Sequence, residues 1–154
     1  MSGESGRYSC MMDAHFETGT AAADVERLAQ WLAARTRVTV ITGAGVSTAS
    51  GIPDYRDGDG NWKRSQPVQY RDFVENDAVR RRYWARSFAG WPMFTAARPS
   101  TAHIALVQLE KLGRVARIVT QNVDRLHQRA GSREVVDLHG RLDVGRCLAC
   151  SNRT

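Results

Sequence analysis

Three groups of residues in this chain could carry out chemistry, and each group directly follows a short apolar run. Residues 43–56, GAGVSTASGIPDYR, combine a GxG pair with a serine, a carboxylate and a guanidinium. Residues 120–124, TQNVD, add amides and a second carboxylate, and the third group is His139 with Gly140. Glycine allows the backbone to approach a ligand closely, and an imidazole exchanges protons near neutral pH. Together the groups indicate a ligand-binding site with a proton-transfer residue.

The glycine pair that opens the first group favours a bound pyrophosphate. Gly43 and Gly45 allow a tight turn, and a helix beginning after them would offer unpaired N–H groups to an anion. A plain structural turn between a strand and a helix is the alternative. Thr48 occupies the third glycine position of the GxGxxG fingerprint, so an ordinary hydride-transfer domain is disfavoured.

The histidine of the third group is a candidate general base. A neutral imidazole that titrates near working pH accelerates proton transfer from a hydroxyl by roughly 10²–10⁴. A structural histidine is the alternative, and the position of His139 at a strand end beside Gly140 favours the catalytic interpretation. His127 is interpreted as helix surface or core, and His103 as a helix residue of unknown role.

The elements that must position these groups follow from hydrophobic patterns. Strands are predicted where β-branched runs are bounded by turn residues, over 38–42, 115–119 and 135–138. Helices are predicted from residue 21 onward, over 76–91 with Pro92 at the end, from a cap at Ser100 or Thr101 to Gly113, and before Gly131. This alternation implies an α/β fold with a parallel sheet. Because ligands of such sheets bind beyond the carboxyl ends of the strands, we expect the three groups to converge.

Two further pairs could bind ligands. Tyr83 and Arg86 are three residues apart on a predicted helix, where a hydroxyl and a guanidinium could hold a carboxylate. The structural alternative is Tyr83 in the core and Arg86 in solvent. Cys147 and Cys150 form a CxxC motif, which could be half of a tetrahedral zinc site or a redox pair, with Cys10 too remote to be a ligand.

These motifs resemble one known family. GAG with Ser47, GIPD followed by an aromatic residue and Arg56, then TQNVD and DLHG, are similar to the motifs of the sirtuins, NAD-dependent protein deacylases. Tyr55, Val123 and Asp137 stand where Phe, Ile and Glu are frequent in that family. The run RYWARSFAGWPMF with PSTAH most resembles the class II branch, which includes the mitochondrial sirtuins.

The resemblance implies a Rossmann-like parallel sheet with helices on both faces, plus the first half of a small zinc-binding module. It implies that NAD is bound by Gly43, Ala44, Gly45, Ser47, Ile52, Pro53, Asp54, Tyr55, Arg56, Gln121, Asn122 and Asp124. It implies catalytic roles for His139 as general base, Asn122 on the ribose and Asp124 on the nicotinamide carboxamide. Tyr83 and Arg86 would bind a negatively charged acyl group, and Cys147 and Cys150 would hold zinc.

The implied reaction transfers the acyl group of an acyl-lysine protein to ADP-ribose and releases nicotinamide. Protein ADP-ribosyl transfer is the alternative within the family. The implied domains are the N-terminal part of the NAD-binding domain, residues 21–140, and the start of the zinc module, residues 141–154. We expect a second CxxC and a further phosphate-binding loop to lie beyond this sequence, and the chain alone to be weakly active or inactive.

Composition limits the partners and the compartment. The formal net charge is +6, almost all of the 22 basic residues are Arg, and they are spread along the chain. A basic zinc-containing nucleic-acid-binding module is therefore a weaker alternative, and no specific nucleic acid is expected. An odd number of cysteines and the lack of a long apolar run predict a cytoplasmic protein with no membrane partner. Residues 1–20 are polar and aperiodic and are predicted to be a mobile leader, and the sequence does not indicate an oligomeric state.

Overall fold

The computed structural model describes residues 21–63 and 67–154, and contacts divide the chain into two units after Arg35. The predicted mobile leader, residues 1–20, lies outside the described residues. The first unit contains α1 (Ala21–Ala33), where a helix is expected. Arg35 lies 4.2 Å from the centre of the Trp31 ring and donates to the Trp31 carbonyl. None of the helices in the described ranges has the length and apolar character needed to cross a membrane.

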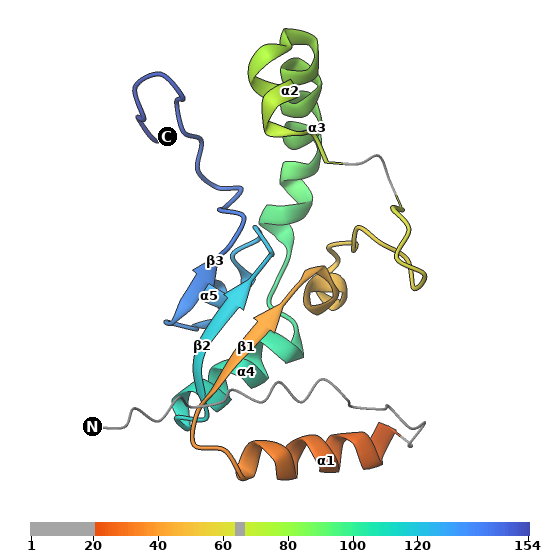
Figure 1. Ribbon diagram of the computed structural model, residues 1–154, viewed down its shortest axis with the longest axis vertical. Helices are drawn as coiled ribbons and strands as arrows, with labels where there is room; N and C mark the ends of the chain where they lie inside the picture. The colour runs from red at the N-terminus through yellow and green to blue at the C-terminus, as the bar shows by residue number, and fades with distance from the viewer. Residues whose placement is uncertain (1–20, 64–66) are drawn as a thin grey trace, which may run out of the picture. The chain divides into compact units, whose positions relative to one another are not determined.

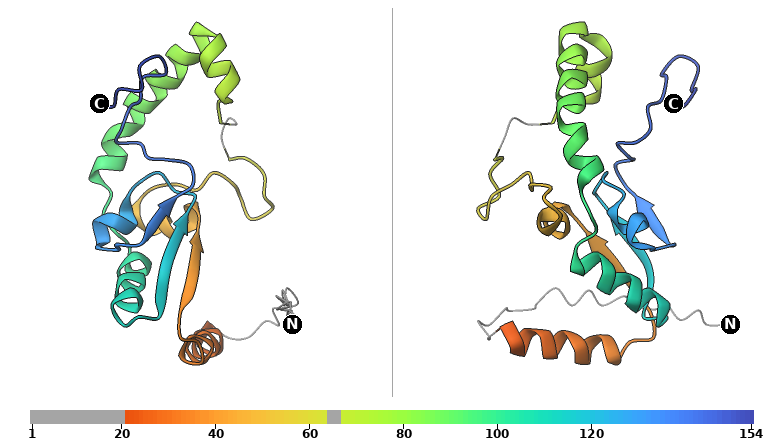
Figure 2. Two further views of the ribbon diagram at one scale, coloured as in Figure 1. Left: turned by 60° about the vertical axis from the view of Figure 1, so that its left-hand side comes forward. Right: turned by 180° about the vertical axis from the view of Figure 1, so that it is seen from behind.

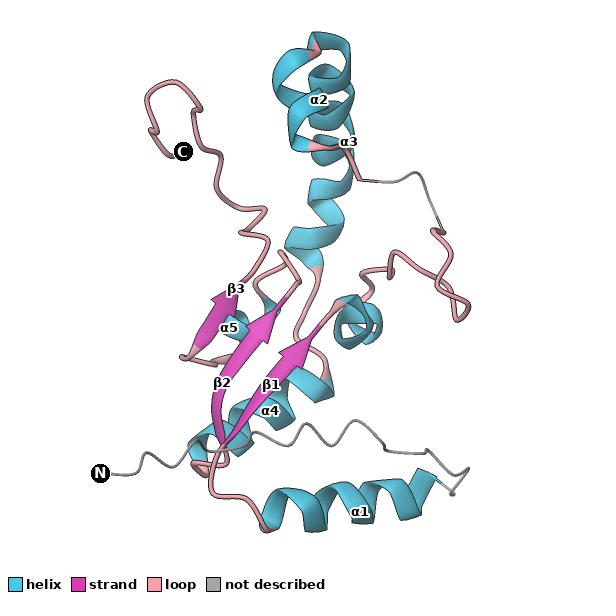
Figure 3. Ribbon diagram, viewed as in Figure 1, coloured by secondary structure: helices cyan, strands magenta, loops and turns pink. Residues whose placement is uncertain are grey.

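The second unit is built on a three-stranded parallel sheet in the order β1 (Val38–Thr42), β2 (Val115–Thr120) and β3 (Val135–Asp137). The strands run in the same direction and end at the same edge (Figure 1, Figure 3). Thr42 pairs with Thr120, and Thr120 pairs with Asp137. The predicted α/β class with a parallel sheet is confirmed, and the segments that follow the three strands start side by side.

Two helices cover one face of this sheet. α4 (Thr101–Lys111) and α5 (Leu126–Ala130) lie on the same side of the strands (Figure 1, Figure 2). Ile118 of β2 and Leu126 of α5 are fully buried there. On the opposite face Ile41 is 73% exposed. Helical cover of both faces, which the sequence predicted, is therefore seen on one face only within residues 36–63 and 67–154.

α4 begins and ends where local sequence signals place it. Ser100 is the N-cap, and it forms a capping box in which the His103 ring accepts from the Ser100 amide at 3.1 Å. Gly113 follows the helix with a φ of +71°, a left-handed conformation that glycine adopts without strain. The predicted cap and stop of this helix are confirmed.

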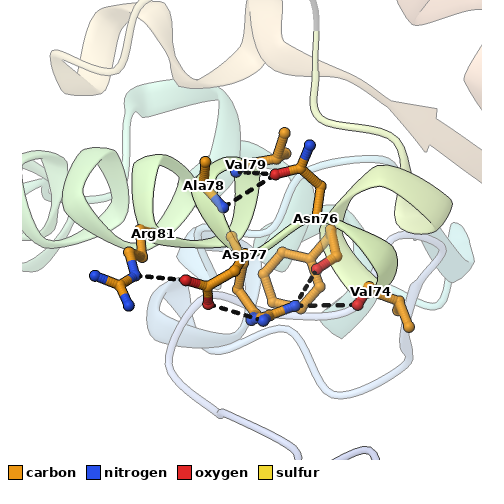
Figure 4. A network of polar contacts seen from close by, with 8 residues as sticks. Val74, Asn76, Asp77, Ala78, Val79 and Arg81 are labelled. Carbon is orange, nitrogen blue, oxygen red and sulfur yellow. Dashed lines mark hydrogen bonds and ion pairs between the residues drawn. The ribbon is translucent and has the colours of Figure 1, made fainter.

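A second helical segment, between β1 and α4, consists of α2 (Tyr70–Glu75) and α3 (Asp77–Ala96). Asn76 separates them and caps α3, because its side-chain oxygen accepts from the amides of Ala78 and Val79 at 3.0 and 3.2 Å (Figure 4). Asp77 then accepts from Arg81 at 2.7 Å. No helix is predicted from the sequence over α2.

The prediction that Pro92 ends α3 is wrong, because the helix continues to Ala96 with Pro92 inside it. Proline removes one backbone hydrogen bond and disfavours helix at the preceding residue, but packing can offset this cost. Phe94, in the last turn, packs against the buried cluster of Ile52, Ala97 and Leu126. Tertiary contact thus stabilises a turn that local sequence disfavours.

Candidate functional site

The segments that follow β1 and β2 are joined by a buried hydrogen-bond network. The Ser47 hydroxyl donates to Asp124 Oδ2 at 2.7 Å. The Asn122 side-chain amide donates to Ser47 Oγ and to the Gly43 carbonyl, both at 3.0 Å. Ser47 is fully buried and Asn122 is 9% exposed. Four residues of the predicted NAD site are therefore brought into direct contact, as expected from the ends of neighbouring parallel strands.

The glycine loop folds into a short 3₁₀ helix, η1 (Ala44–Ser50), immediately after β1. Gly51 ends it with a φ of +84°, which directs Ile52 into the buried cluster. A Cβ on Gly43 would lie 4.0 Å from the Gln121 side-chain nitrogen, so Gln121 faces this loop. A Cβ on Gly45 would have no atom within 4 Å. No contact within the described chain requires glycine at position 45, so the space beside it is available to a ligand.

Asp124 is held by the backbone as well as by Ser47. Its Oδ1 accepts from the Leu126 amide at 2.9 Å, which fixes the carboxylate at the start of α5. Arg125, between them, has a φ of +64°, an uncommon conformation for a residue with a side chain. A small cavity of about 100 Å³ adjoins Asp124, lined also by Trp91 and Phe94 of α3.

An ion pair connects this turn to the end of β3. The Arg125 guanidinium bonds to Asp137 Oδ2, and Gln128 donates to Asp137 Oδ1 at 2.9 Å. The Leu138 amide donates to the Thr120 carbonyl at 2.9 Å. These contacts with β2 and with the turn that follows it fix the position of the segment that contains His139.

His139 lies in a turn two residues after β3 and is exposed. Gly140, beside it, has a φ of +76°, which reverses the chain. No hydrogen bond to the His139 ring occurs within the described ranges. The structure therefore places the predicted general base at the same sheet edge as Asn122 and Asp124, with its ring open to a ligand.

The second half of the predicted cofactor loop, residues 53–56, contacts the loop that follows it instead of the Asn122 segment. Asp54 is paired with Lys63 at 2.5 Å. Arg56 donates to the Gly60 carbonyl at 2.5 Å, and its guanidinium lies 4.1 Å from the centre of the Trp62 ring, near Tyr55. Pro53 is exposed. Asp54, Tyr55 and Arg56 thus contact the loop that follows them, whereas Gly43 and Ser47 bond to the Asn122 segment.

The predicted acyl-binding pair lies on α3. Tyr83 is half-buried and packs edge-on against Phe73 of α2, with 5.0 Å between ring centres, and against Trp84. Arg86 is exposed on the same helix. The aromatic contacts match the structural alternative for Tyr83, and its acyl-binding role stays a prediction.

The predicted zinc ligands lie in a tight turn near the end of the chain. The Cys147 amide donates to the Asn152 carbonyl at 2.8 Å, and the Ser151 amide donates back to the Cys147 carbonyl at 2.9 Å. Hydrogen bonds from the backbone amides of Cys150 and Ala149 lower the pKa of the Cys147 thiol. Both thiols are free and exposed, and no group of three or more metal-binding side chains occurs in the part of the chain that the structure describes.

Sequence reasoning missed a pair of buried histidines behind the network. His103 of α4 is 0% exposed, His127 of α5 is 1% exposed, and their ring centres are 4.6 Å apart. The pKa of His127 is lowered to about 4, mainly by burial and also by the neighbouring His103, while Asp124 and Asp137 oppose this shift. Burial also lowers the pKa of His103, opposed by Asp124. A histidine at the third position of a capping box and a second one directly after the apolar Leu126 were the available signals.

The protein-family model described as the Sir2 family matches residues 43–154. A relative from Bradyrhizobium diazoefficiens, named NAD-dependent protein deacetylase 2, is 57% identical over 129 residues, or 84% of this chain and 47% of that protein. NAD-dependent protein deacylase Sirt4 of Drosophila melanogaster is 53% identical over 133 residues, or 84% of this chain and 43% of that protein. The crystal structure of a Sir2 homologue in complex with NAD matches with a TM-score of 0.70 and 40% identity, over 84% of this chain and 50% of that one. This chain thus spans about half the length of the relatives it matches.

Proposed function

This chain belongs to the Sir2 family, and from that premise we propose that it provides half of the catalytic core of an NAD-dependent protein-lysine deacylase. The substrate is an acyl-lysine in a protein, and the acyl group passes to ADP-ribose. The names of the relatives and the NAD complex of a matching structure support this proposal. Free thiols suit a reducing compartment, so we also propose a cytoplasmic location.

The observation that carries the proposal is the contact between Ser47, Asn122 and Asp124 beside an open Gly45. Buried polar groups that bond one another across two loops form a preorganised site, which limits the reorganisation needed when a ligand binds. The loop backbone at Gly43 and Gly45 provides close approach for a diphosphate, and Gln121 faces the same loop. The residues present therefore fit the cofactor that the family requires.

The chemistry divides among the residues at this edge of the sheet. NAD would supply the glycosidic bond that breaks as nicotinamide leaves, and the amide oxygen of the acyl-lysine would form the new bond to the ribose carbon. Asp124, held by Ser47, would accept from the nicotinamide carboxamide next to Ile52, and Asn122 would orient the ribose. His139 would take the proton of a ribose hydroxyl, so that this oxygen can attack the acyl carbon and carry the acyl group to ADP-ribose. The exposed ring of His139 is open to a ribose at the carboxyl ends of the strands.

Zinc binding at Cys147 and Cys150 is part of the proposal. The backbone amides of Ala149 and Cys150 stabilise a thiolate at Cys147, and a thiolate is the form that binds zinc. A tetrahedral structural site needs four ligands, so two further ligands must come from outside the described residues. The role of the metal would be structural.

A negatively charged acyl group is the proposed substrate class, supported by the spacing of Tyr83 and Arg86 on one helix. A peptide with succinyl-lysine should then be deacylated faster than one with acetyl-lysine. The preference should be lost in Arg86→Ala. Equal rates for the two peptides in the unchanged protein would contradict this substrate class.

The test of the function is an assay of the intact protein with NAD and an acyl-lysine peptide. We expect nicotinamide and deacylated peptide to form in equal amounts and Asn122→Ala to abolish both. Glu134→Gln, at an exposed carboxylate of the same unit, should leave the rate unchanged. Transfer of label from the ADP-ribose moiety of NAD to protein, without deacylation, would show the alternative reaction instead.

A further inference from the structure

The two buried histidines are the largest polar groups of the core that the proposed reaction does not use. His103 comes from α4 and His127 from α5, the two helices that cover one face of the sheet. Burying a polar ring costs free energy unless its nitrogen atoms are hydrogen-bonded. One nitrogen of each ring contacts a hydroxyl group next to the site, Ser100 for His103 and Thr42 for His127. These contacts indicate the structural role of the two histidines.

His127 is connected to the Asn122 segment. Its Nε2 lies 2.9 Å from Thr42 Oγ1, and Thr42 donates to Thr120 Oγ1 at 2.9 Å. Thr120 Oγ1 also accepts from the Asn122 amide at 3.1 Å. A continuous chain of hydrogen bonds therefore runs from the His127 ring through the ends of β1 and β2 to the backbone of Asn122.

His103 is connected to the glycine loop. The Ser100 hydroxyl lies between two acceptors, His103 Nδ1 at 2.7 Å and the Val46 carbonyl of η1 at 3.1 Å, and its single proton can be donated to either. The Ser100 amide donates to the same ring nitrogen at 3.1 Å. One ring of the pair thus supports the loop that carries Ser47, and the other supports the turn that carries Asn122.

The hydrogen bonds determine where each ring carries its proton. His103 Nδ1 accepts from the Ser100 amide, so the proton of the neutral ring is on Nε2. If the Thr42 hydroxyl donates its proton to Thr120, the Thr42 oxygen accepts from His127 Nε2–H, and we infer that Nδ1 of that ring is unprotonated. The remaining nitrogens, His103 Nε2 and His127 Nδ1, are buried without a partner among the described residues. In these tautomers one of the two nitrogens is a donor and the other an acceptor.

We propose that His103 and His127 form a neutral positioning pair that holds η1 and the Asn122 turn in register for NAD binding. The proposal rests on the proposed function, because it assigns the pair to the same site. The pair does not touch the cofactor and acts through Ser100, Thr42 and Thr120. If the histidine pair positions both loops, its loss weakens NAD binding. If the pair only fills space, apolar side chains of similar size could replace it without loss of NAD affinity.

The experiment compares variants of the intact protein by NAD affinity. His127→Gln keeps a side-chain N–H in place of Nε2–H, and His127→Leu removes it. We expect Leu to raise the Kd for NAD about tenfold, the equivalent of one lost hydrogen bond, and Gln to restore most of the affinity. Thr42→Val and Thr42→Ser form a second matched pair with a smaller change of volume. Unchanged affinity in both Leu and Val variants would overturn the proposal.

A spectroscopic measurement separates this proposal from the proposed function. The nitrogen chemical shifts of both rings, read by NMR in the absence of NAD at neutral pH, should show protonated Nε2 and unprotonated Nδ1 in each. A charged ring, or a proton on Nδ1 of His127, would overturn the pair even if deacylation were observed. The expected tautomers with no NAD binding would instead refute the proposed function.

Discussion

The Ser47 hydroxyl and the Asp124 carboxylate are joined by a 2.7 Å hydrogen bond, although the two residues are 77 positions apart in the chain. The bond closes the glycine loop of β1 onto the turn that follows β2. Asp124 Oδ1 accepts from the Leu126 amide, so both oxygens of the carboxylate have a partner within the chain. Contacts of the protein itself therefore hold this carboxylate in place.

Ser47→Ala should weaken both folding and NAD binding. The substitution removes a partner from Asp124 and from Asn122 in a buried position, which costs about 1–3 kcal/mol of unfolding free energy. Chemical denaturation and calorimetric titration with NAD measure the two effects. The matched control is Ser50→Ala in the same helix η1, because the buried Ser50 hydroxyl has no partner within the described ranges. Equal effects of the two substitutions would contradict the role of Ser47.

Asp137→Asn should reduce turnover more than NAD affinity. The change weakens the bonds from Arg125 and Gln128 that hold the end of β3, two residues before His139. Arg125 and Asp137 are 24% and 19% exposed at their side chains, so the pair is shielded from solvent. Glu134→Gln alters the exposed pair with Arg117 on the same sheet and should have little effect. Steady-state kinetics with varied NAD would distinguish kcat from KM.

His139→Ala should lower deacylation by roughly 10²–10⁴ while NAD binding persists. The ring is exposed and no described residue bonds to it, so its loss should not alter stability. Single-turnover rates and calorimetric titration measure the two properties. Retained deacylation at the normal rate would remove His139 from the mechanism.

Stability should fall as the pH is lowered from 6.5 to about 4. In this pH range His127 binds a proton in the unfolded chain but not in the folded chain. The reason is that folding lowers the pKa of His127 from an ordinary value of 6.5 to about 4. That difference corresponds to about 3 kcal/mol of unfolding free energy, fully present above pH 6.5. Asp124 and Asp137 face this ring and limit the shift. Denaturation curves of His127→Gln should show a shallower pH dependence than the unchanged protein, and identical slopes would contradict the assignment.

Cys147→Ser and Cys150→Ser should each lower the zinc content of the intact protein. Replacing a thiolate by a hydroxyl removes a preferred ligand, and a tetrahedral site with three ligands binds zinc less tightly. Metal analysis after dialysis against a mild chelator measures the loss. Ser151→Ala, in the same turn but without a thiol, is the control. Full zinc content in both cysteine variants would place the metal elsewhere.

Local sequence patterns were sufficient for much of this architecture. β-branched runs marked all three strands, Ser100 and Gly113 marked the limits of α4, and Gly131 marked the end of α5. The motifs also resemble those of one known family, and the match to residues 43–154 confirms this resemblance. Caps, periodicity and glycine turns depend on neighbours within a few residues, so they can be read from the chain itself.

Only the tertiary structure decided which polar groups meet. Thr42 and His127 are 85 positions apart, and no local pattern indicates that this ring bonds to a strand end. The loop of residues 43–56 reads as one motif, yet its first part bonds to Asn122 and its second part to Lys63 and Trp62. Likewise α3 continues past Pro92 because Phe94 packs on a distant cluster. The physical reason is the same in each case. Long-range packing and burial contribute more free energy than local conformational preferences, which are worth from about 1 kcal/mol to a few kcal/mol.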